Sequence, residues 1–413
     1  MTAEYKRRTF IGMAAAGVAA GLAPGIAATP PADVKIGLLM PLSGRYAESG
    51  ASVLRGASMV IDEVNTANGI KSLGGARLKL VVADDGSEPA KASLDARRLM
   101  TEDKVSFIIG PYSTPEAEAF MPVADRYQVG GLGLQTTLVP KTPYFATLSI
   151  TADGFGKGYA ALVKWLREKG QKIDTIVLTY ANNDYGQTVA KSAIAALQAQ
   201  GVKVLDTIAV DQQAKDMTPV VLRVKSLKPD AVISVVYFED GVLLHKARFN
   251  LGYDDPIWIG GSAGFTDDKL WGVLGDEVAS RTLTHAFGLA FYSPDANLPG
   301  MRDAARRGLA AYPGKVIDQS FMFGAQAGIL VARAVAAAGS ADPERVNIAL
   351  HALKFPAKAP EIVLPFIVGD LSFNRNGILE GTSPLFVQWH DGKKAIVFPE
   401  AVASAQPAFE KAR

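Results

Sequence analysis

Short apolar runs and helical patterns alternate along this chain from residue 35 onward, and this alternation restricts the fold more than any other feature. Four runs have the length and the branched side chains of buried strands: 35–40, 77–83, 105–109 and 129–134. Segments with apolar residues at helical spacing separate them. Strands that are joined through helices pair in parallel, so the loops that follow them gather at one edge of the sheet. We therefore expect an α/β fold with a doubly wound parallel sheet.

The segment 105–120, VSFIIGPYSTPEAEAF, contains the loop with the strongest binding signal. Tyr112, Ser113 and Thr114 form a polar elbow after the strand. Pro115 and Glu116 then have the character of a first helical turn. Free backbone N–H groups beside small hydroxyls at a positive helix end favour a bound carboxylate or phosphate. In the alternative interpretation, Ser113 or Thr114 only caps its own helix.

A second series of alternating elements follows the first and predicts a second α/β unit of similar size. A strand at 144–149 is expected to leave the first unit. The expected strands of the second unit are 175–179, 202–210, 231–236, 257–259 and 281–287, with helices between them. Three helices are then expected at 301–312, 324–339 and 343–353. Strands at 362–370, 384–390 and 395–398 close the chain, with turns at 376–377 and 391–392.

Residues 1–28 have the character of an export signal. Arg7 and Arg8 precede a run rich in alanine and glycine, and small residues at Gly25, Ala27 and Ala28 suit a signal peptidase. This pattern predicts a twin-arginine signal peptide, with the general secretion route as the alternative. No later segment is expected to be apolar enough to span a membrane. We therefore expect a soluble, exported periplasmic protein.

Composition excludes several classes of protein. The chain has no cysteine, so disulfides, thiolate metal sites and a lipid-modified N-terminus are not expected. Its 43 Lys and Arg residues balance 41 Asp and Glu residues, which gives no basic stripe for nucleic acid.

The motifs of hydrolases and nucleotide-binding enzymes are absent. The four histidines, which are His245, His285, His351 and His390, form no metal-spaced pair. We expect no enzyme activity, no cofactor and no metal, and we interpret Asp84 and Asp85 as a turn after a strand.

Four motifs carry a resemblance to a known family. They are KIGLLMPLSGRYAESG at 35–50, ADDGSEP at 83–89, IIGPYST at 108–114 and NNDYGQ at 182–187. By the order and spacing of these motifs, the chain resembles the branched-chain amino acid and amide binding proteins of ABC importers, which have the type I periplasmic binding fold. The resemblance covers residues 33–400. It implies two lobes, 33–148 with 288–365 and 149–287 with 366–405, which are joined by three crossings near 149, 287 and 365 and close on a ligand at a hinge.

The resemblance also implies the residues of the site. In the family, the loop after the third strand holds a ligand carboxylate, and the loop after the fourth adds a backbone carbonyl and a threonine. Further contacts come from aromatic residues of the second lobe and from the first loop. The matching residues are Ser113, Thr114, Gln135, Thr137, Tyr185, Tyr237, Tyr46 and Ser49. Glu239 and Asp240 are interpreted instead as the start of a helix.

The chain departs from the family where many relatives place an acid for a ligand ammonium. Loop 260–264 has no acid, and Ser262 stands in its place. The acceptors that remain for a ligand ammonium are Tyr185, Tyr237, the Gln135 carbonyl and Glu48 or Glu239. The predicted function is capture of a small carboxylate, with an amino acid as first choice, by a monomer that delivers it to an ABC permease and ATPase. The alternatives are an aromatic or keto acid that lacks an ammonium and, in another class, a ligand-sensing receptor domain.

The twin arginine gives a first prediction. Replacing Arg7 and Arg8 with lysine should leave unprocessed precursor in the cytoplasm, because the twin-arginine route depends on this pair. Fractionation and immunoblotting of the variant against the wild type measure this. Normal amounts of processed protein in the periplasm would assign export to another route.

Overall fold

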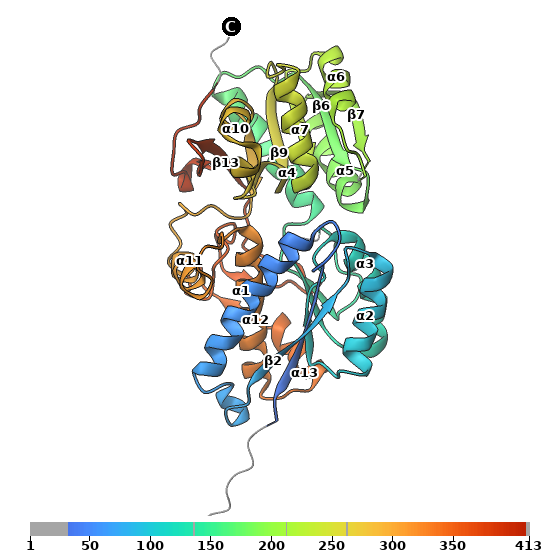
Figure 1. Ribbon diagram of the computed structural model, residues 1–413, viewed down its shortest axis with the longest axis vertical. Coiled ribbons are helices and arrows are strands. Elements are labelled where there is room, and N and C mark those ends of the chain that lie inside the picture. Colours follow the sequence, from blue (N-terminus) through green and yellow to red (C-terminus); the bar gives the residue numbers. More distant parts are fainter. Residues whose placement is uncertain (1–31, 135–136, 212, 262, 410–413) are drawn as a thin grey trace, which may run out of the picture. The chain divides into compact units, whose positions relative to one another are not determined.

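The first sheet is built from the first third of the chain and is wholly parallel (Figure 1). In the computed structural model, which describes residues 32–134, 137–211, 213–261 and 263–409, its strand order is β2-β1-β3-β4-β5. The strands are β1 (Val34–Met40), β2 (Leu78–Asp84), β3 (Phe107–Ile109), β4 (Gly131–Gly133) and β5 (Phe145–Thr147). The parallel sheet expected from the sequence is confirmed. The predicted signal peptide, Gln135 and Ser262 lie outside the described residues.

Helices cover both faces of this sheet. One face packs against α1 (Ala47–Thr66) and α12 (Gln319–Ala338), and the other packs against α2 (Pro89–Thr101) and α3 (Thr114–Tyr127). The alternation of strand residues explains the two layers, because successive side chains point to opposite faces. Leu38 belongs to the layer of α1 and α12, whereas its neighbour Leu39 belongs to the layer of α2 and α3.

The second sheet has seven strands in the order β14-β13-β10-β9-β8-β6-β7. They are β6 (Thr175–Ala181), β7 (Lys203–Val210), β8 (Ala231–Val235), β9 (Ile257–Gly261), β10 (Phe287–Ala290), β13 (Leu385–His390) and β14 (Lys393–Phe398). The strands from β10 to β7 are parallel, whereas β13 and β14 form an antiparallel hairpin at the edge. Asp391 and Gly392 make the turn of this hairpin with φ values of 48° and 78°.

The second sheet is also covered on both faces. The helices α4 (Ala152–Glu168) and α5 (Asp184–Gln198) share one apolar cluster with it, and α6 (Thr218–Leu227) and α7 (Phe238–Asn250) share another. The remaining helices of four or more residues are α8 (Ala263–Thr266), α9 (Leu270–Leu274), α10 (Asp276–Leu283), α11 (Pro299–Ala311) and α13 (Pro343–His351). Both sheets thus have the doubly wound architecture that the sequence predicts.

Two predicted strands were wrong. Residues 281–287 do not form a strand: α10 extends to Leu283, and β10 begins only at Phe287. The acidic first turn of α10 and the helical spacing of its buried Ala279, Thr282 and Leu283 account for the helix. Residues 362–370 are irregular, apart from one isolated bridge at Ile367, and residues 362–367 are buried. A crossing at residue 287 would divide β10, so it fits better after Ala290.

The helix α12 corrects a further expectation. It has the length and composition of a membrane-spanning helix, which no segment after residue 28 was expected to have. However, 78% of its most apolar window is buried, and the helix packs along α1 (Figure 1). This burial is typical of the core helix of a globular protein.

Glycines let α1 and α12 approach closely. A methyl carbon at Gly324 of α12 would lie 2.1 Å from the Val53 carbonyl oxygen, and one at Gly56 of α1 would lie 2.0 Å from the Phe321 carbonyl oxygen. Both distances are far inside van der Waals contact, and both neighbours are backbone atoms that cannot turn aside. Only glycine at these two positions permits the observed spacing of the helices.

The second prediction follows from this contact. Gly324→Ala should force the helices apart and destabilise the fold by on the order of 2–3 kcal/mol, even though alanine favours a helix. The melting temperature should fall by about 2–4 °C in differential scanning calorimetry. Gly272→Ala in α9 is the matched control, because no atom lies within 4 Å of the added methyl. Equal melting temperatures for the two variants would contradict the role of Gly324.

Candidate ligand-binding site

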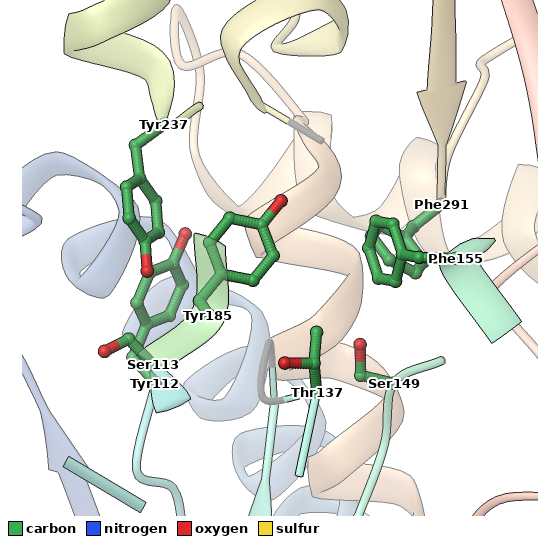
Figure 2. Close-up of a pocket in the computed structure, with 8 residues that line it drawn as sticks. All are labelled: Tyr112, Ser113, Thr137, Ser149, Phe155, Tyr185, Tyr237 and Phe291. Carbon is green, nitrogen blue, oxygen red and sulfur yellow. The ribbon is translucent and has the colours of Figure 1, made fainter. Parts of the chain in front are cut away.

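Loops that follow strands of both sheets line a single pocket (Figure 2). The strands of the first sheet contribute Tyr112, Ser113, Thr137 and Ser149. The strands and helices of the second sheet contribute Phe155, Tyr185, Tyr237 and Phe291. No charged side chain belongs to this lining among the described residues. The carboxyl ends of parallel strands are where α/β folds bind ligands.

The first sheet supplies hydroxyl groups. Ser113 follows β3, Thr137 follows β4 and Ser149 follows β5. All three side chains are at most 4% exposed. Hydroxyl groups both donate and accept hydrogen bonds, so this side of the pocket suits a polar group that accepts several of them.

The second sheet supplies aromatic rings. Tyr185 lies in the first turn of α5, Tyr237 precedes α7, and Phe291 directly follows β10. Phe155, in the first turn of α4, joins them: its ring centroid lies 5.7 Å from that of Phe291 and 6.2 Å from that of Tyr185. In Figure 2 the rings of Tyr185, Phe155 and Phe291 lie across the pocket from Thr137 and Ser149. This side suits an apolar or aromatic group.

The pocket is small and closed. Its cavity volume is about 10 Å³, which is enough for one water molecule and far below the range for ligand pockets. A larger ligand therefore requires the tyrosine rings or the two walls to move apart.

The structure brings four predicted site residues together in this lining: Ser113, Thr137, Tyr185 and Tyr237. Thr114 lies behind the lining, where its Oγ1 accepts a hydrogen bond of 3.2 Å from the Thr137 backbone N–H. It therefore positions Thr137.

Two predicted residues of the first loop lie beside the lining. The ring of Tyr46 is 4.9 Å from that of Tyr237 and 5.9 Å from that of Tyr112. Ser49 lies within hydrogen-bonding reach of the Tyr112 hydroxyl. Tyr46 and the first turn of α1, which contains Ser49, thus lie against the aromatic residues.

The capping interpretation of the 105–120 segment is wrong for Ser113. This residue stands at the N-cap of α3 but makes no side-chain cap hydrogen bond. Its hydroxyl donates instead to the carboxylate of Glu116, one turn into the helix. Because Ser113 also lines the pocket, Glu116 is one hydrogen bond away from any ligand that binds there.

Glu116 is only 3% exposed and has an altered protonation equilibrium. Burial raises its pKa to about 7, and the negative charge of Asp85 adds to the effect. Glu116 in turn raises the pKa values of Tyr46 and Tyr237, so it lies close to both phenols. The sequence placed Glu116 in the first turn of a helix, but it did not indicate this connection to the pocket.

An ion pair connects the first loop to α7. The Arg45 guanidinium lies 2.5 Å from the carboxylate of Asp240, whose side chain is 1% exposed. Glu239 and Asp240 form the first turn of α7, as the sequence predicts. Glu48, one of the alternative acceptors, instead faces Lys269 at 3.4 Å, with 68% of its side chain exposed.

Four lining residues were missed. Tyr112 and Ser149 follow strands like the predicted residues, so the rule that selected Ser113 also indicates them. Phe291 was missed because the predicted strand ended at residue 287, three residues before the end of β10. Phe155 lies on a helix, and no sequence pattern separates it from ordinary core residues.

Asp84 and Asp85 act as a turn. Asp84 accepts hydrogen bonds from the backbone N–H groups of Leu42, Ser43 and Gly86 and from the Ser43 hydroxyl. Within the described residues, no group of three or more His, Cys, Asp or Glu side chains has the arrangement of a metal site.

Comparisons with known proteins identify the family. Residues 33–378 match the family model of periplasmic binding proteins, and the chain belongs to this family. Its members are substrate-binding proteins of transporters and not enzymes.

A curated relative and two solved structures illustrate the range of the similarity. The Leu/Ile/Val-binding protein BraC3 of Rhizobium johnstonii is 29% identical, over 88% of this chain and 93% of its own length. LivJ of Streptococcus pneumoniae, in complex with isoleucine, has a TM-score of 0.72 at 20% identity, over 88% of this chain and 97% of its own. A solute-binding protein from R. palustris, in complex with 4-hydroxybenzoate, has a TM-score of 0.74 at 19% identity, over 88% of this chain and 95% of its own. The fold is that of type I periplasmic binding proteins.

Proposed function

We propose that this protein captures a small monocarboxylate in the pocket between the two sheets and delivers it to the permease and ATPase of an ABC importer. The observation that supports this proposal best is the lining: buried hydroxyls on one side, aromatic rings on the other, and no charged side chain among the described lining residues. The hydroxyls bind the carboxylate, and the rings bind the body of the ligand.

The lobes of this importer component are residues 33–148 with 291–365 and residues 149–290 with 366–405. The crossings between them act as a hinge, and the ligand stabilises the closed state because it contacts both lobes only there. The mature protein is an exported, soluble periplasmic monomer without a lipid anchor. Its leader directs it to the twin-arginine route.

The ligand proposed first is an aromatic or keto monocarboxylate without an ammonium. A buried ammonium needs an acid or several oriented acceptors, because an unpaired buried charge is strongly unfavourable. The described lining offers no acid for it. The binding of 4-hydroxybenzoate by a protein of the same fold is consistent with this choice.

A branched-chain amino acid is the second candidate. The relative BraC3 is named as a Leu/Ile/Val-binding protein, and LivJ, which has the same fold, holds isoleucine. Glu116 is the acid nearest to the lining, and an ammonium beside Ser113 would benefit from its negative charge.

The third prediction separates the two candidates. In a thermal-shift screen at equal concentrations, benzoate and 2-oxo acids should raise the melting temperature more than leucine, isoleucine or valine, because bound ligand stabilises the folded state by mass action.

Thr137→Val should weaken binding of the best carboxylate about ten- to a hundredfold in calorimetry, since a hydrogen bond to a charged group contributes roughly 1.5–3 kcal/mol.

Thr282→Val is the matched control for this substitution. Thr282 is a buried threonine of α10 outside the pocket, and its hydroxyl donates to the Val278 carbonyl. The affinity of the Thr282→Val variant for the ligand should equal that of the wild type. Stabilisation by amino acids alone would replace the first candidate with the second, and full affinity in Thr137→Val would remove the hydroxyl side of the pocket from the proposal.

The fourth prediction concerns pH. A carboxylate bound beside Ser113 places a second negative charge near Glu116, so it raises the pKa of Glu116 further above 7. Binding then takes up a proton. The affinity should be greatest below pH 7 and should fall as the pH rises from about 6 to 8, although the ligand itself stays ionised over this range.

The variant Glu116→Gln tests the origin of this dependence. Glutamine keeps a hydrogen-bonding partner for Ser113 but does not titrate, so its affinity should be constant between pH 6 and 8. Calorimetry at several pH values measures both proteins. An affinity of the wild type that increases with pH would indicate an ammonium beside Glu116 and would favour the amino acid, because the bound cation lowers the pKa.

A further inference from the structure

Two buried phenol hydroxyls lie beyond the aromatic side of the pocket. Tyr159 is 0% exposed and Tyr185 is 4% exposed, and neither hydroxyl has a hydrogen-bonding partner among the described residues. Buried hydroxyls of folded proteins are nearly always paired, so two unpaired ones in one place require an explanation. In Figure 2 the Tyr185 hydroxyl points away from Ser113 and Thr137, toward the side opposite the predicted carboxylate.

Both hydroxyls converge on Gly261, at the end of β9. A methyl carbon at this position would lie 2.3 Å from the Tyr159 hydroxyl oxygen and 3.6 Å from that of Tyr185. Only glycine therefore leaves room for the Tyr159 hydroxyl. The rings that carry the two hydroxyls both contact Phe155, with centroid distances of 6.4 Å for Tyr159 and 6.2 Å for Tyr185. Phe155 and Tyr185 line the pocket itself.

We propose that the hydroxyls of Tyr159 and Tyr185 beside Gly261 form a second polar subsite, which binds an uncharged hydroxyl group at the end of the ligand opposite its carboxylate. This inference rests on the proposed function and specifies its substrate class as hydroxylated aromatic monocarboxylates. The Ser113 and Thr137 side binds the carboxylate, Phe155 and Phe291 contact the ring, and the two phenols bind the distal hydroxyl.

The chemistry of the subsite favours a neutral group. A phenol both donates and accepts, so two phenols satisfy a ligand hydroxyl in both directions. Burial raises the pKa of Tyr159 and of Tyr185, so both stay protonated and uncharged at neutral pH. A cation or anion would lose its hydration here without gaining an opposite charge. A ligand without the hydroxyl would leave both phenols unpaired, which selects against it.

The test uses the purified mature protein with benzoate and 4-hydroxybenzoate, which differ only in the distal hydroxyl. Calorimetry should show that the wild type binds 4-hydroxybenzoate at least about tenfold more tightly than benzoate. In Tyr159→Phe and in Tyr185→Phe, the ratio of the two affinities should fall to near one. Tyr312→Phe, which changes a tyrosine outside the pocket beside Phe321, should keep the wild-type ratio.

A double variant fills the subsite. In Tyr159→Phe/Gly261→Ala, the new methyl no longer meets the Tyr159 hydroxyl oxygen. It lies 3.6 Å from the ring carbon that carried this hydroxyl and 3.6 Å from the Tyr185 hydroxyl oxygen, and both are ordinary contacts. The double variant should fold and should bind 4-hydroxybenzoate no better than benzoate. Without ligand, Tyr159→Phe should melt at the same temperature as the wild type or higher, because the substitution removes an unpaired buried hydroxyl.

Three outcomes would overturn the subsite. They are equal affinities of the wild type for the two acids, a preference for 4-hydroxybenzoate that survives both single substitutions, and a lower melting temperature of ligand-free Tyr159→Phe, which would indicate a structural role held by a bound water. Binding of benzoate in the first two cases leaves the proposed function intact. Failure of the wild type to bind either acid contradicts the proposed ligand class and the subsite together.

Discussion

Parallel strand pairing is the constraint on which the rest of this structure depends. Because every strand from β1 to β5 runs in the same direction, the loops after β3, β4 and β5 meet at one edge and bring Ser113, Thr137 and Ser149 together. The parallel part of the second sheet does the same for Tyr237 and Phe291. The site is thus composed of residues that are far apart in the chain but equivalent in their position after a strand.

Close backbone packing keeps these strand ends in place. The helices α1 and α12 touch through glycines, and an added methyl group at either Gly56 or Gly324 would collide with a carbonyl oxygen. Such contacts leave little freedom for the layer that supports the first sheet. The pocket therefore forms against a rigid wall, and the movement needed to admit a ligand falls to the aromatic residues and to the crossings between the sheets.

The pocket is surrounded by polar groups, but none of its described lining residues carries a charge. Ser113 bonds to Glu116, whose pKa of about 7 makes its charge adjustable near neutral pH. Tyr159 and Tyr185 are neutral, and neither phenol hydroxyl has a hydrogen-bonding partner among the described residues. A site of this kind selects a ligand by the number and position of its hydrogen-bonding groups, since each buried group left unpaired lowers the affinity.

The sequence by itself determined the doubly wound order of elements, because strand and helix periodicity are local properties of the chain. It also indicated Ser113, which follows a recognisable strand. Through the family resemblance it indicated Thr137, Tyr185 and Tyr237, which follow strands as well. Tertiary structure alone decided that Phe155 and Phe291 face these hydroxyls, that Glu116 bonds to Ser113, and that two phenols meet at Gly261. These contacts join residues on different elements, and their distances depend on how the helices pack on the sheets, which no local pattern records.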